Sequence, residues 1–214
     1  MWDWSFTIAI LPELLKALKI TLSATVVAYF LACVLGLLIA MVKRTTWKLV
    51  VYAVSGVVEF IRSTPILAQL YFVFYVFPKF GLTLTPFVAG VLTIGVHYST
   101  YLSEVYRAGI DAVPVGQWEA ASVLNFSRAR IWLTIIIPQA IPPIVPVLGN
   151  YLIALLKETP LLSAITLVEV LETAKIIGDN SFRYLEPITL VGLIFLVLSY
   201  LLSLLVQQIH AKLS

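Results

Sequence analysis

A stripe of polar side chains runs through an apolar stretch between residues 86 and 110. Thr93, His97, Tyr101 and Glu104 follow one another at spacings of four, four and three residues, which places them on one face of a helix. Such a face could hold a small molecule that carries an ammonium group, through charge-assisted hydrogen bonds to the carboxylate. The same groups could instead pair with neighbouring helices and hold them together, and His97 could simply be a packed histidine.

Further polar candidates lie in or beside other apolar stretches. Glu158 either joins the binding site or pairs with Lys157 or Lys175, and Lys157 is also the fixed cation that we expect could reach Glu104. Without a cation, an ionised carboxylate at membrane depth costs on the order of 3 kcal/mol. The remaining candidates for substrate binding are Gln69, Tyr71, Asn150 and Thr159.

Glu59 and Arg62 are charged residues three positions apart, at the end of a mildly apolar stretch. Residues at this spacing are neighbours on a helix surface, so we expect them to form an ion pair with each other. We therefore assign them a structural role and not a role in binding.

The elements that carry these residues must lie in lipid. The chain of 214 residues is 61% hydrophobic and 12% charged, with a mean hydropathy of +1.01. Long apolar runs without alternation predict an all-α integral membrane protein, because a spanning helix needs roughly 20 apolar residues. We expect a single domain, 1–214, with about five spans at approximately 20–42, 60–77, 86–110, 138–157 and 188–208.

Proline signals locate two helix starts. Ser63 or Thr64 could cap a helix whose first residue is Pro65, so the second span should be broken or bent near its start. Thr85 before Pro86 gives the same signal for the third span.

Five spans would leave the two termini on opposite sides of the membrane. Three cations in the short loop at 43–48 favour a cytoplasmic position for that loop. We therefore expect an external N-terminus, a cytoplasmic C-terminus, a cytoplasmic segment at 111–137 and no cleaved leader. A single cysteine, Cys33, excludes an internal disulfide, and no metal site is expected.

The cytoplasmic segment predicts a short helix at approximately 115–125. Pro114 and Gly116 interrupt the preceding helix, and Asn125, which tolerates a left-handed backbone, ends the short one. Small side chains at Ala120 and Ala121 could fit closely into a cleft on another protein. The alternative is a helix that lies on the lipid headgroups.

Four motifs make the chain resemble one family. The run VPVGQWEAASVLNFSRARIWLTIIIPQA resembles the EAA loop of the membrane subunits of bacterial ATP-driven (ABC) importers, with Asn125 where that family usually has Gly. The segments EFIRSTPILAQLYF, YLSEVYRAGIDAVPVGQ and LKETPLLSAIT resemble motifs of permeases of the polar amino acid uptake group, and the likeness extends over about 12–210. The chain is identified as a member of this group.

The resemblance implies the type I ABC importer fold and a coupling role for the short helix. The residues expected to contact a cytoplasmic ATPase are Gln117, Glu119, Ala120, Ala121, Leu124 and Asn125. The chain contains no phosphate-binding loop, so it is not expected to be an enzyme, and ATP and Mg²⁺ should bind to the partner.

The resemblance also implies an assembly in the bacterial inner membrane. It comprises two ATPase subunits, a second permease chain, expected to form a homodimer, and an extracytoplasmic amino-acid-binding protein. Transport would proceed by alternating access. The two acidic candidates favour a basic amino acid as substrate, and no nucleic-acid partner is expected.

Two other classes of function remain open from the residues alone. A membrane enzyme could use His97 with Ser99 or Ser103, although residues two apart on a helix point apart and no hydrolase motif occurs. A channel or assembly protein would not require the EAA loop.

Overall fold

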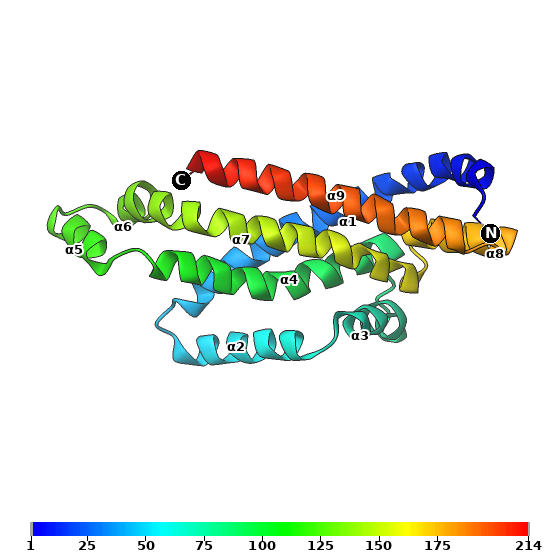
Figure 1. Ribbon diagram of the computed structural model, residues 1–214. Coiled ribbons are helices and arrows are strands. Elements are labelled where there is room, and N and C mark those ends of the chain that lie inside the picture. Colours follow the sequence, from blue (N-terminus) through cyan, green and yellow to red (C-terminus); the bar gives the residue numbers. More distant parts are fainter. Residues whose placement is uncertain (1, 214) are drawn as a thin grey trace.

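The computed structural model describes residues 2–213, which form helices and connecting turns without any strand. Four long helices, α1 (Trp4–Lys43), α4 (Pro86–Asp111), α7 (Ile137–Glu158) and α9 (Leu185–Leu213), run along the length of the molecule (Figure 1). The N-terminus lies at one end of these helices and the C-terminus at the other. The all-α prediction is confirmed.

Within the described residues, three helical segments are long and apolar enough to cross a membrane. These are Trp4–Lys43, Arg128–Ile165 and Leu185–Lys212. A fourth candidate is the pair Lys48–Ser63 and Ile66–Phe80, which is bent by 103°. Helix α4 is not among these candidates, because its polar stripe lowers its mean hydropathy. A fifth span over 86–110 therefore stays a prediction. Helix α1 extends beyond the predicted first span because Asp3 caps it, accepting the N–H groups of Ser5 and Phe6.

The bend separates α2 (Lys48–Ser63) from α3 (Ile66–Tyr71), which continues as a π-helical turn (Phe72–Val76) and a 3₁₀ turn (Phe77–Phe80). The predicted break is present, but Pro65 is the residue before α3 and not its first residue, and no side chain caps this start. At the other predicted start, Thr85 accepts the N–H of Val88 and Pro86 begins α4. That prediction is confirmed.

Small residues allow α1 and α4 to pack closely. A Cβ atom at Gly36 would lie 2.9 Å from Cβ of Leu102 and 3.0 Å from the backbone oxygen of Ser99. Ala24, Ala28 and Ala32 of the same helix are almost fully buried. Such small residues let two backbones approach where lipid provides no hydrophobic driving force. This contact fixes α4, and therefore the polar stripe, against α1.

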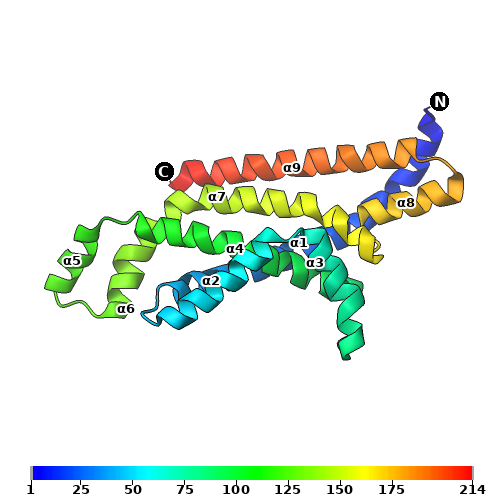
Figure 2. The same cartoon turned by 90° about the horizontal axis from the view of Figure 1, so that it is seen from below.

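Three shorter segments complete the chain. Helices α5 (Val115–Val123) and α6 (Arg128–Ile131), with a π-helical turn (Trp132–Ile136), form the end of the molecule near the C-terminus (Figures 1 and 2). A 3₁₀ turn (Thr159–Ile165) and α8 (Val170–Ser181) lie at the opposite end. Helix α8 was not predicted from the sequence.

Candidate functional site

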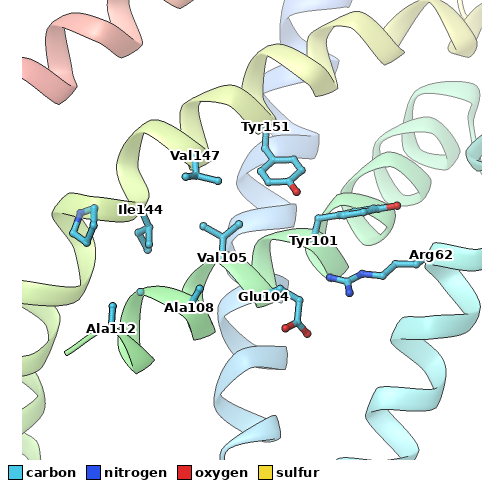
Figure 3. Close-up of a pocket in the computed structure, with 11 residues that line it drawn as sticks. Arg62, Tyr101, Glu104, Val105, Ala108, Ala112, Ile144, Val147 and Tyr151 are labelled. Carbon is cyan, nitrogen blue, oxygen red and sulfur yellow. The ribbon is translucent and has the colours of Figure 1, made fainter. Parts of the chain in front are cut away.

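A cavity of about 520 Å³ lies between α2, α4 and α7 (Figure 3). Its polar lining comes from Arg62 on α2, Tyr101 and Glu104 on α4, and Tyr151 on α7. Aliphatic side chains and small residues of α4 and α7 form the remaining wall. Two residues of the predicted stripe, Tyr101 and Glu104, therefore face a common space.

Glu104 is held by two cations of its own chain. The Nζ atom of Lys43, at the end of α1, donates to Oε1 over 2.8 Å, and Nη2 of Arg107 lies 2.5 Å from Oε2. The side chain of Lys43 is only 9% exposed. The cation expected at this carboxylate was Lys157, which instead lies exposed near the far end of α7. Both oxygens of Glu104 thus have an internal partner.

Arg62 lines the cavity together with Glu104 (Figure 3). Its Nη2 donates to the backbone oxygen of Thr100, and its guanidinium carbon lies 5.0 Å from the centre of the Tyr101 ring. Its Nε has no hydrogen-bond partner within the described residues. The expected ion pair with Glu59 is wrong, because the bend after α2 directs Arg62 to α4 while Glu59 accepts from Ser63.

Aromatic rings form one side of the site. The ring centre of Tyr101 lies 6.0 Å from that of Tyr151, 6.3 Å from that of Tyr98 and 5.5 Å from that of His97. Tyr151 was not among the predicted residues, since nothing in the sequence distinguishes it from other tyrosines of the chain. The RSTP segment could have drawn attention to Arg62, because a cation beside a helix break is unusual in an apolar run.

His97 and Gln69 do not line the cavity but hold the break between α2 and α3. The amide nitrogen of Gln69 donates to the backbone oxygens of Ile61 (2.6 Å) and Thr64 (3.1 Å) and to the Thr64 hydroxyl (2.6 Å). Its amide oxygen lies 3.2 Å from Nδ1 of His97. Since α2 ends at this break, the network positions Arg62 next to the cavity.

The other predicted contact residues lie away from the cavity. Tyr71 is 42% exposed on α3 and packs near Tyr75. Asn150 is exposed, and Glu158 is half-buried at the end of α7. Thr159 is fully buried and donates to the backbone oxygen of Leu156 over 2.7 Å.

The geometry disfavours a serine–histidine pair. Ser99 and Ser103 donate to the backbone oxygens of Val96 and Thr100, and His97 is engaged with Gln69. In the part of the chain that the structure describes, no three His, Cys, Asp or Glu residues gather as a metal site would require.

Helix α5 forms a second candidate site at the end of the molecule. It ends before Asn125, whose φ of 56° confirms the predicted left-handed turn. Glu119 and Ala120 are exposed, and Leu124 is 64% exposed. Gln117 is also exposed and accepts from Gln139 over 3.3 Å. These side chains are available to a partner.

Ala121, unlike Glu119 and Ala120, is buried within its own chain. It is 1% exposed and belongs to a buried cluster with Ile131, Ile136 and Ala140 of the same chain. The rings of Trp118 and Trp132 meet edge to face beside this cluster, with centres 5.2 Å apart. The small side chain therefore seats α5 on its own chain, while the opposite face of the helix stays open.

Comparison with known proteins gives consistent results. The sequence pattern for the family described as "binding-protein-dependent transport system inner membrane component" matches residues 10–214. A probable amino-acid ABC transporter permease of Sinorhizobium fredii is 47% identical and aligns over 99% of this chain and 91% of the relative. The arginine transport system permease of Bacillus subtilis is 32% identical over 99% and 97% of the two chains.

Solved structures agree with these matches. A chain from the crystal structure of an amino acid ABC transporter with histidines superposes with a TM-score of 0.92, at 34% identity and 99% coverage of both chains. A chain of the MetNI methionine ABC transporter superposes with a TM-score of 0.78 at 19% identity, over 96% of this chain and 98% of that one, which supports the fold alone.

Proposed function

The chain belongs to the family of binding-protein-dependent transport system inner membrane components, and from this premise we propose how it works as a transmembrane subunit of an importer. Its cargo is an amino acid, which occupies the cavity between α2, α4 and α7. Relatives whose names give amino acids as cargo support this assignment, as does a cavity that places a guanidinium, a carboxylate and two phenols around one space.

The energy for import comes from a partner. We assign ATP and Mg²⁺ to a cytoplasmic ATPase that receives α5, two copies per complex. A second permease chain, expected to be identical, completes the pathway, and an extracytoplasmic binding protein delivers the amino acid. In this arrangement α5 and the C-terminus are cytoplasmic, the N-terminus is external, and five spans cross a bacterial inner membrane.

The proposal that α5 contacts the ATPase depends on the position and exposure of this helix. One face is anchored to the chain through Ala121 and the paired tryptophans, whereas Glu119, Ala120 and Leu124 are exposed on a helix at the very end of the molecule (Figure 2). An element that is rigidly joined to the long helices and open on its outer face can pass a displacement of the partner to the cavity.

Substitution on the exposed face tests coupling. In proteoliposomes that contain the chain with its ATPase, Glu119→Ala should reduce amino acid uptake at least tenfold while the ATPase still turns over, since the partner loses its contact with the pathway. Ser122→Ala on the same helix, where the hydroxyl donates only to the backbone of Trp118, is the matched control. Unchanged uptake in Glu119→Ala would exclude the proposed role of α5.

A further inference from the structure

The cavity between α2, α4 and α7 has two unlike walls. Among the described residues that line it, α2 and α4 contribute the charged side chains of Arg62 and Glu104, together with Tyr101. The α7 wall is aliphatic apart from one phenol, and its residues are Pro143, Ile144, Val147 and Tyr151 (Figure 3). A cargo in this space therefore meets charge on one side and a mainly apolar surface with a single hydroxyl on the other.

The charged wall consists of residues that lie in shared motifs. Arg62 belongs to the segment EFIRSTPILAQLYF, and Tyr101 and Glu104 belong to YLSEVYRAGIDAVPVGQ, both of which resemble motifs of the permease group as a whole. The charged groups are also engaged within the chain, Glu104 with two cations and Arg62 with a backbone oxygen. Such a wall is suited to contacts that every cargo of the group shares. The α7 wall, at residues 143–151, lies outside the four motif segments.

The ring of Tyr151 is held in place by two neighbouring aromatic rings. Its centre lies 6.2 Å from that of Tyr98, which is 8% exposed, and 6.0 Å from that of Tyr101. The hydroxyl points from α7 toward α4 (Figure 3), and it forms no hydrogen bond within the described residues. By contrast, the hydroxyl of Tyr29 donates to the backbone oxygen of Leu148 over 3.0 Å. Since a tyrosine hydroxyl away from bulk water usually finds a hydrogen-bond partner, that of Tyr151 is available to a ligand.

We propose that Tyr151 is a specificity-determining residue of this cavity. Its hydroxyl forms a hydrogen bond with the polar end of the cargo's side chain, so the site favours a polar amino acid over an apolar one of the same size. This inference rests on the proposed function, namely that an amino acid occupies the cavity. It assigns the contact with the side chain to α7 and not to the charged wall.

The chemistry of the α7 wall supports this assignment. Val147 and Ile144 lie about one and two turns before Tyr151 on the same helix face, and their aliphatic surfaces can pack against the methylene groups of a side chain. An apolar side chain would pack equally well, but it would displace water from the hydroxyl without replacing the lost hydrogen bond, which is unfavourable. A site that hydrogen-bonds its substrate rejects an analogue that lacks the polar group. Because a hydroxyl both donates and accepts, an amide, a carboxylate or an ammonium group can each serve as its partner.

A binding panel on the assembled complex tests the preference. The probes are radiolabelled glutamine, glutamate and arginine, with methionine as the apolar probe, added to the chain purified with its ATPase partner in the absence of binding protein. At least one polar probe should bind more tightly than methionine, and the tightest of them is then used with the variants. Tightest binding of methionine would overturn the inference, whereas failure of every probe to bind would instead overturn the proposed occupancy of the cavity by an amino acid.

Removing the hydroxyl alone assigns the preference to Tyr151. Tyr151→Phe keeps the ring that packs beside Tyr98 and Tyr101, so the variant should assemble. It should weaken binding of the polar probe about fivefold, the effect of one neutral hydrogen bond, and leave methionine binding unchanged. Tyr200→Phe, the same substitution at an exposed position of α9, is the matched control and should alter neither affinity. Unaltered binding of the polar probe in Tyr151→Phe would overturn the inference, as would an equal loss for both amino acids, because Tyr151 would then only shape the site.

Discussion

Two groups of charged side chains join distant parts of the chain, and they differ in the donors that their carboxylates use. Beside the cavity, Glu104 contacts two side-chain cations. At the opposite end of the long helices, Glu186 receives the N–H of Asp3 over 3.1 Å as well as the guanidinium of Arg183. Arg183 also reaches Asp3 over 3.2 Å, so this cluster links the start of α1 to the start of α9.

Backbone N–H groups are the common feature of the outer end. Asp3 accepts the hydroxyl and N–H of Ser5 and the N–H of Phe6, and these hydrogen bonds, with that of the Ser5 hydroxyl the strongest influence, lower the pKa of Asp3 to about 2. Glu169 accepts two N–H groups in the same manner at the start of α8. Neutral donors satisfy a carboxylate without adding charge, whereas the cation-rich setting of Glu104 leaves positive charge beside an open space. The first arrangement holds helices together, and we propose that the second holds a ligand.

The largest effect should follow from removing the charge of Glu104. In Glu104→Gln, Lys43 stays almost buried without its counter-charge, and we expect the free energy of unfolding of the detergent-purified chain to fall by about 2 kcal/mol, between the values for exposed and fully buried pairs. Chemical denaturation monitored by tryptophan fluorescence would measure it.

A second substitution tests whether the stability lost in Glu104→Gln comes from the broken ion pair with Lys43. Adding Lys43→Met to Glu104→Gln removes the unpaired charge and should recover most of the lost stability. A double variant that is no more stable than Glu104→Gln would show that the contact between Lys43 and Glu104 is not the source of the effect.

A smaller and purely structural effect is expected at the outer end. Arg183→Gln should lower the thermal unfolding midpoint, because α1 and α9 lose a shared cation, while amino acid affinity changes by less than twofold. Lys175→Gln is the control, since its partner Glu172 lies one turn away on the same helix and the pair joins no distant segments. A tenfold change in affinity in Arg183→Gln would remove the distinction between the two clusters.

Local signals in the sequence predicted local structure well. The pair Thr85–Pro86 predicted where α4 begins, and Asn125 predicted the left-handed residue after α5. Each of these features depends on the residue itself and its immediate neighbours. The break before α3 belongs to the same class, displaced by one residue at Pro65.

Contacts between side chains of different helices could not be predicted from such local signals. Arg62 has Glu59 as its neighbour along the helix, but it turns to α4 because the bend and the packing of α2 bring Thr100 within reach. Lys43 appeared to be a loop cation, yet the close packing of α1 on α4 brings it to Glu104. Ala121 is buried because α6 and the following turn fold back on α5. Such contacts follow from helix packing, which spacing in one segment does not encode.

The last predicted effect concerns pH and the buried carboxylate of Glu169. Burial raises its pKa from the ordinary value of 4.5 to about 7, and the N–H groups of Leu171 and Glu172 only partly oppose this. The folded chain therefore holds this proton more tightly than the unfolded chain. The resulting stability is fully present below about pH 4.5 and is lost as pH rises through about 7, with a slope of at most about 1.4 kcal/mol per pH unit.

Glu169→Gln should flatten that slope, because the amide keeps an acceptor for the two N–H groups and does not ionise. The exposed variant Glu59→Gln should leave the slope as it is, so comparing unfolding midpoints of the two variants at pH 5 and pH 7 isolates Glu169. If the slope due to Glu169 has the opposite sign, the backbone donors outweigh burial, and two neutral N–H groups are then sufficient to keep a buried carboxylate charged. A carboxylate in this chain would then need no cation to stay ionised, and the two cations at Glu104 would require another explanation.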